Sequence, residues 1–156
     1  MKTLFFLVSM GFPLSGLASD AVKEIEKDLS KTTLTYCENV RETQCYSLKY
    51  STSDSAVYNS RILKENIRIG VKGAQLKKLE VVFLSLTEVF QAELLRQKAM
   101  KRDRPCQMIK LLRVDSPENL SNYEFCWSWA GSQVRKQVKS LRKKLEKMAT
   151  QPSKDE

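Results

Sequence analysis

Histidine is absent from this chain of 156 residues. Without an imidazole, the chain cannot form the Ser-His or Cys-His pairs of nucleophilic enzymes, and it lacks the usual general base. Glycine is scarce, with five residues, and none of them belongs to a glycine-rich loop that could bind a phosphate. These absences exclude the commonest catalytic motifs, so we predict that the protein is not an enzyme and needs no cofactor.

Paired carboxylates are the remaining candidates for acid–base chemistry. One pair is Glu88 with Glu93, and another is Asp103 with Glu124. Glu88 and Glu93 fall on the polar side of a predicted helix, where a solvated surface explains them better than catalysis does. We therefore predict no catalytic residue.

Long apolar runs are limited to one, at residues 4–14 after Met1-Lys2-Thr3. This run is shorter than the ~20 residues that span a bilayer, and Gly16-Leu17-Ala18 places small residues at −3 and −1 of a cleavage site. We predict that residues 1–18 are a secretory signal peptide. A buried N-terminal helix is the alternative. The predicted location is periplasmic or secreted, with no transmembrane segment.

The chain contains four cysteines, and an even number in an exported protein predicts two disulfides. Free buried thiols are the alternative. The spacings within the chain do not match zinc sites, so we predict no metal. The cysteines are Cys37, Cys45, Cys106 and Cys126.

Helical periodicity dominates the rest of the chain. Residues 74–106 carry an apolar stripe at gaps of three and four, and residues 121–150 carry a second one. A shorter pattern covers residues 55–69, and no strand alternation stands out. The sequence therefore predicts an all-α fold, a small disulfide-stapled helical bundle with antiparallel helices, over residues 19–150. Residues 151–156 are predicted to form a flexible tail.

The antiparallel order predicts which cysteines pair. Helix 55–69 would begin beside the end of the central helix, and the last helix would begin there too. This arrangement favours Cys45–Cys106 with Cys37–Cys126. The alternative has two local loops, Cys37–Cys45 and Cys106–Cys126.

Positive charge is in excess, with a formal net charge of +9. Such a charge attracts anionic partners by long-range steering, although a solvated surface that aids solubility is the simpler interpretation. The expected partners are anionic lipid, acidic polysaccharide or an acidic protein, and nucleic acid is not expected. The candidate anion-binding residues are Lys101, Arg102, Arg104, Arg135, Lys139, Arg142, Lys143 and Lys147.

Three blocks of the sequence resemble the LprI-type lysozyme-inhibitor family. The first is Cys37 with Thr43-Gln44-Cys45, followed by Tyr50, Asp54, Tyr58 and Asn59. The second runs from Arg96-Gln97 to Arg102-Asp103-Arg104-Pro105-Cys106, and the third is Cys126 with Arg135 and Leu141. The usual tryptophan before Arg-Asp is missing, and the gap between the first two cysteines is shorter.

The resemblance implies a small exported bacterial protein with a four-cysteine helical domain that inhibits a lysozyme by protein–protein contact. Many lysozymes are basic, so a basic inhibitor would be repelled at long range. The competing hypothesis is an envelope or secreted interaction protein that uses its basic helix on anionic lipid or polysaccharide.

Overall fold

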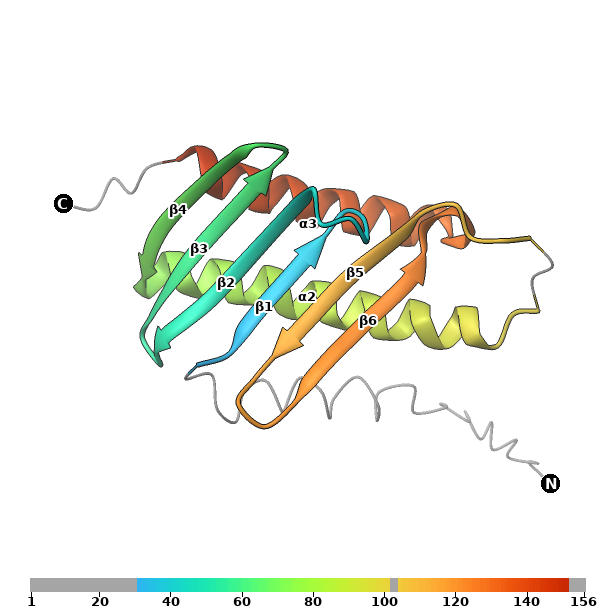
Figure 1. The fold of residues 1–156 in the computed structure, drawn as a ribbon, viewed down its shortest axis with the longest axis horizontal. Coiled ribbons are helices and arrows are strands. Elements are labelled where there is room, and N and C mark those ends of the chain that lie inside the picture. Colours follow the sequence, from blue (N-terminus) through green and yellow to red (C-terminus); the bar gives the residue numbers. More distant parts are fainter. Residues whose placement is uncertain (1–30, 102–103, 152–156) are drawn as a thin grey trace, which may run out of the picture.

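The computed structural model describes residues 31–101 and 104–151, which form a six-stranded antiparallel sheet with two long helices on one face (Figure 1). The predicted all-α bundle is therefore wrong. The predicted signal peptide, the positions Arg102 and Asp103, and most of the predicted tail lie outside the described residues. The strands are β1 (Thr33–Cys37), β2 (Gln44–Thr52), β3 (Ser55–Ile62), β4 (Glu65–Lys72), β5 (Ile109–Asp115) and β6 (Leu120–Cys126).

The strand order is β4-β3-β2-β1-β5-β6. The first four strands form a meander, and β5 and β6 form a hairpin that pairs with β1. Helix α2 (Gly73–Lys98) connects the two groups of strands. A 3₁₀ turn (Trp127–Trp129) then leads from β6 into helix α3 (Ser132–Thr150).

The strands form because side chains alternate with a period of two. In β2, Tyr46, Leu48 and Tyr50 are buried, whereas Lys49 is exposed. Aromatic and β-branched residues favour this half-buried, pleated backbone. The predicted helix 55–69 is wrong because its apolar spacing also fits a hairpin: Tyr58 and Ile69 lie opposite each other on β3 and β4.

Both long helices were predicted, but their limits differ. The stripe of α2 is confirmed, with Leu79, Phe83 and Phe90 fully buried, although the helix ends at Lys98 and does not extend over the whole predicted segment 74–106. The predicted last helix begins later, at Ser132, because residues 120–126 extend the sheet as β6.

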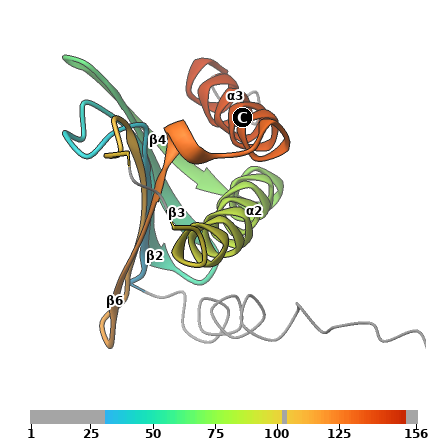
Figure 2. The ribbon, with the colours of Figure 1, turned by 90° about the vertical axis from the view of Figure 1, so that its right-hand side faces the viewer.

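The core lies between the inner face of the sheet and the two helices, which run side by side (Figure 2). Phe90 of α2 lies at its centre, with its ring centroid 5.9 Å from that of Tyr36 and 4.7 Å from that of Phe125. Both contacts are edge-to-face, which is a favoured geometry for aromatic rings. This packing fixes α2 against β1 and β6.

Two disulfides are present, but the predicted long-range pairing is wrong. Cys37 pairs with Cys45, and Cys106 with Cys126. Cys37 and Cys45 lie directly opposite each other on β1 and β2. Strand β5 separates Cys126 on β6 from β1, which places Cys37 and Cys126 about two strand spacings apart, roughly 10 Å. A disulfide cannot bridge that distance.

We expect the longer disulfide loop to contribute more stability. The sequence separations are 8 for Cys37–Cys45 and 20 for Cys106–Cys126. Chain entropy then predicts a loss of about 2.5 kcal/mol when both cysteines of the first pair become serine, and about 3.3 kcal/mol for the second. Urea unfolding of the two double variants measures the difference, and peptide mapping that finds Cys45 joined to Cys106 would contradict the assignment.

Candidate functional site

Helix α3 has a basic surface with almost no acidic residues. Between Ser132 and Thr150 it carries seven lysines and arginines and one acidic residue, Glu146. Its predicted apolar stripe is confirmed, since Val138 and Leu145 are buried and the other stripe residues of α3 pack beside them. The lysines of α3 are exposed on the remaining surface, namely Lys136, Lys139, Lys143, Lys144 and Lys147.

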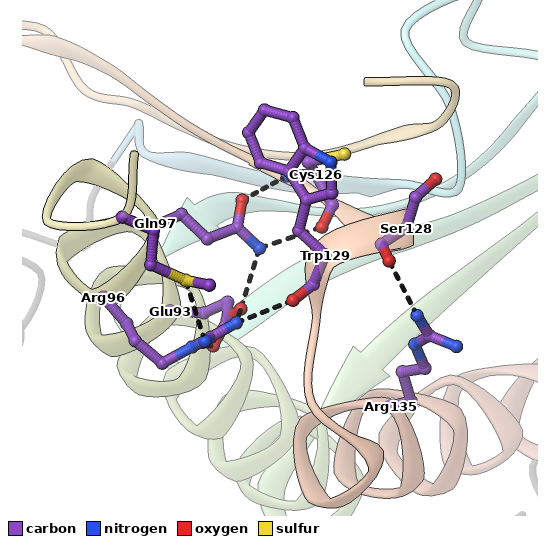
Figure 3. Close-up of polar contacts among 8 residues, drawn as sticks. Glu93, Arg96, Gln97, Cys126, Ser128, Trp129 and Arg135 are labelled. Atoms are coloured by element: carbon purple, nitrogen blue, oxygen red, sulfur yellow. Dashed lines mark hydrogen bonds and ion pairs between the residues drawn. The ribbon is translucent and has the colours of Figure 1, made fainter. Parts of the chain in front are cut away.

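The arginines of α3 have structural partners. Arg135 donates a hydrogen bond to the backbone oxygen of Ser128 at 2.9 Å (Figure 3). Its guanidinium also lies 5.9 Å from the centre of the Trp127 ring. Arg142 lies 3.2 Å from a carboxylate oxygen of Glu146 and 3.9 Å from one of Glu38. These contacts occupy Arg135 and Arg142, so the predicted anion site loses two of its members.

A groove of about 510 Å³ lies between the first half of α2 and the last half of α3. We call it the lysine groove. We call its apolar lining residues, among them Val81, which is 62% exposed, the floor of the groove. Its lining residues are Lys77, Lys78, Val81, Val82, Lys144, Lys147, Met148 and Gln151.

Only Lys147 of the lysine groove belongs to the predicted anion site. Lys101 and Arg104 are exposed, but they follow the other end of α2. The other three groove lysines are not among the predicted residues, namely Lys77, Lys78 and Lys144. The sequence predicts that the last helix begins beside the end of the central helix, but not which faces of α2 and α3 meet. Only that packing brings the lysines of the two helices together.

No acidic side chain neutralises the lysine groove in the described part of the chain. None of its four lysines makes an ion pair there. The carboxylates closest in sequence have other partners: Glu80 accepts a hydrogen bond from Tyr50 at 2.9 Å, and Glu146 contacts Arg142 and Tyr46. The field of the lysines is therefore available to an external anion.

A second charged cluster lies where the β1–β2 loop meets β5 and α3. Glu38 pairs with the buried Lys110 and accepts a hydrogen bond from Tyr36. The Lys110 ammonium also lies 4.8 Å from the centre of the Trp127 ring. Burial raises the pKa of Tyr36 far above its usual value, and the neighbouring Glu38 raises it further. These groups satisfy one another, which indicates a stabilising role.

A third polar network joins the end of α2 to the turn before α3 (Figure 3). Glu93 is only 2% exposed, so its predicted place on a solvated surface is wrong. Arg96 donates to Glu93 at 2.8 Å and to the backbone oxygen of Trp129 at 2.7 Å. Gln97 donates to Glu93 at 2.7 Å and to the backbone oxygen of Cys126 at 2.9 Å, and it accepts from the Cys126 N–H at 2.7 Å.

The residues that carry the family resemblance do not form one site. Tyr50 and Tyr58 are buried on the inner face of the sheet, and the Tyr58 hydroxyl donates to the backbone oxygen of Leu145 at 2.7 Å. Asp54 is exposed in the β2–β3 turn. Asn59 belongs to the outer face of the sheet, opposite Ser47. The first block of the resemblance is thus explained by local structure in a sheet.

Metal binding and membrane crossing find no support in residues 31–101 and 104–151. Over these ranges, no three Cys, Asp or Glu side chains are arranged to hold a metal ion. Neither α2 nor α3 is apolar enough over a sufficient length to cross a bilayer. No protein-family model matches the chain, and the comparison with curated proteins gave no match.

Proposed function

We propose that this chain is a non-catalytic binding protein that holds an anionic partner at the lysine groove and the adjoining surface of α3. The observation that supports this proposal is the set of four lysines around the groove, which have no ion-pair partner in the described residues. Basic residues near an anionic lipid surface each contribute about 1 kcal/mol of binding.

The charge pattern of α3 favours binding over solubility alone. Lys143 and Lys147 are spaced i,i+4, and so are Lys139 and Lys143. Like charges at this spacing destabilise a helix by about 0.2–0.5 kcal/mol per pair. A surface that served only solubility would mix both signs, as most helices do. The unmixed surface therefore has a cost to stability that an anionic partner would offset.

The two disulfides support a partner outside the cytosol. Two disulfides are compatible with an exported protein, since such bonds persist in oxidising compartments. We therefore propose a partner outside the cytosol, such as anionic lipid or acidic polysaccharide. Inhibition of a lysozyme, which the family resemblance implies, is the competing proposal, and it requires a target whose contact surface is acidic.

Charge reversal in the lysine groove tests the proposal. Changing Lys78, Lys144 and Lys147 to glutamate is expected to weaken binding to vesicles that contain phosphatidylglycerol by at least 100-fold, at about 1 kcal/mol per lysine. Added salt should weaken binding by the native protein and have little effect on the variant. Arg142 is kept intact because it makes structural ion pairs with Glu38 and Glu146.

The matched control places the same charge change on the outer face of the sheet. Lys49, Arg61 and Arg68 are all exposed there, so the triple glutamate variant has the same net charge. We expect it to lose less than 5-fold in vesicle affinity. Equal losses in the two variants would show that only net charge matters. Salt-insensitive inhibition of a lysozyme without vesicle binding would favour the competing proposal.

A further inference from the structure

We infer that the lysine groove binds an anionic lipid with a single alkyl chain, such as a fatty acid or a lysophospholipid. This inference rests on the proposed function and specifies its ligand. The lysines would bind the carboxylate or phosphate head group, and the floor would contact the alkyl chain of the lipid. The volume of about 510 Å³ lies within the range of about 300–1,000 Å³ that is usual for ligand sites.

The floor of the groove is apolar, which a purely ionic site does not need. Val81 is 62% exposed, whereas its neighbour Val82 is buried against the core. Met148 lines the opposite wall and is half-buried. Methionine is unbranched and adapts to irregular apolar surfaces. Val81 and Met148 therefore offer a contact surface for an alkyl chain that lies along the two helices.

The lysines come from both helices and so flank the floor on both sides. Lys77 and Lys78 come from α2, and Lys144 and Lys147 come from α3. Lysine side chains bury their methylene stems along apolar surfaces while the ammonium group stays in water. In such an arrangement the four stems would extend the apolar walls and the four ammonium groups would line the rim, where the head of an amphiphile would lie.

Each simpler ligand leaves part of the groove unmatched. Inorganic phosphate or a polysaccharide would pair with the ammonium groups but leave Val81 exposed to water. A neutral hydrocarbon would cover Val81 but partly desolvate the lysines without giving them a counter-charge, which is unfavourable. A single-chain anionic lipid matches both features.

Titration calorimetry with a homologous set of probes, which measures the affinity of the full-length protein for each probe, tests this inference. The probes are inorganic phosphate, butyl phosphate and dodecyl phosphate, with the dodecyl compound kept below its micelle concentration. We expect dodecyl phosphate to bind at least 10-fold more tightly than butyl phosphate. Dodecyl maltoside, which has the same chain and no charge, should bind at least 10-fold more weakly than dodecyl phosphate.

A pair of valine variants tests whether the alkyl chain of the ligand lies in the groove. Val81→Ser is expected to weaken dodecyl phosphate binding at least 5-fold and to leave binding of heparin, a soluble polyanion, unchanged. Val40→Ser is the matched control, since Val40 is 52% exposed and lies in the β1–β2 loop. It should leave both affinities unchanged.

The outcomes separate this inference from the proposed function. Affinity that does not rise with the length of the alkyl chain, or equal effects of the two valine variants, would overturn the inference of a single-chain lipid. Heparin binding in the same experiments would still support the proposed anionic partner. Equal binding of dodecyl maltoside and dodecyl phosphate would also overturn it, because the lysines would then contribute nothing. Absence of binding to every anionic probe, vesicles included, would overturn both.

Discussion

Raising the pH above 10 is expected to unfold this protein cooperatively. Tyr36, Tyr46, Tyr50 and Tyr58 are almost completely buried, and burial is the main cause that raises the pKa of each hydroxyl. For Tyr46 the pKa rises to about 12. In the unfolded chain these hydroxyls ionise near pH 10. Above that pH the folded state binds more protons than the unfolded state, so the free energy of unfolding falls as the pH rises.

The expected effect is large because the four contributions add. Each tyrosine contributes a slope of about 1.4 kcal/mol per pH unit between pH 10 and its folded pKa, so four tyrosines contribute about 5 kcal/mol per pH unit. A typical domain is stable by about 5–15 kcal/mol, so unfolding should follow within one to three pH units. Tyrosinate absorbance at 295 nm and far-UV circular dichroism should change together.

A single variant checks the source of this slope. Tyr46→Phe removes one ionising hydroxyl, along with its hydrogen bonds to Gln44 and Glu146. Its free energy of unfolding should fall less steeply above pH 10, by about 1.4 kcal/mol per pH unit. The fifth tyrosine, Tyr123, is only partly buried, so the readout is the absorbance in excess of one tyrosine. If that excess rises near pH 10 while the circular dichroism stays native, the buried hydroxyls ionise in the folded protein, contrary to this expectation.

Replacing Gln97 with alanine should lower the free energy of unfolding by about 2–4 kcal/mol. The Gln97 amide pairs with both the N–H and the C=O of Cys126. Strand β6 is at the edge of the sheet, so these two hydrogen bonds replace those that a neighbouring strand would make. Loss of the Gln97 amide leaves these two backbone groups and the buried Glu93 short of partners, and each unsatisfied buried group costs about 1–3 kcal/mol. Urea unfolding at pH 7 measures the loss.

Gln91 provides a matched control on the same helix. Its side-chain oxygen is buried without a hydrogen-bond partner in the described residues, so Gln91→Ala removes no such bond. We expect a change below about 0.5 kcal/mol, as for most substitutions away from hydrogen-bonded or core positions. Equal losses for the two variants would show that the pairing with Cys126 contributes nothing.

The helices were predictable, whereas the sheet was not recognised. The stripes of α2 and α3 repeat over several turns, so the period of 3.6 stands out. The strands are short, and the alternation of Tyr46, Leu48 and Tyr50 spans too few residues to stand out from the surrounding polar residues. Between residues 55 and 69 the apolar spacing fits both a helix and a hairpin. Tertiary pairing, which determines the true period there, is not visible in local sequence.

The candidate site depended on the same missing information. The basic character of α3 was evident from its sequence, and Lys147 was correctly placed on an exposed surface. The contribution of Lys77 and Lys78 follows only from which faces of α2 and α3 meet. Burial of Glu93 likewise follows from the turn at Trp127–Trp129, which lies against the end of α2. The number of disulfides followed from composition, but their pairing required the strand order.

The strand order also indicates the sequence of folding events. Within residues 31–101 and 104–151, the two groups of strands meet only where β1 pairs with β5. The residues that pair there, such as Cys37 and Leu111, are more than 70 positions apart. Pairing over such a distance is slow, because the intervening chain must close into a loop first. The meander β1–β4 contains only local hairpins, so we expect it to form early and β5, β6 and α3 to dock later. One wall of the lysine groove is α2, which follows the meander directly, and the other is α3, which belongs to this late unit. A ligand that bridges the two walls would therefore bind only the fully assembled protein. It would also slow the opening of the C-terminal third of the chain.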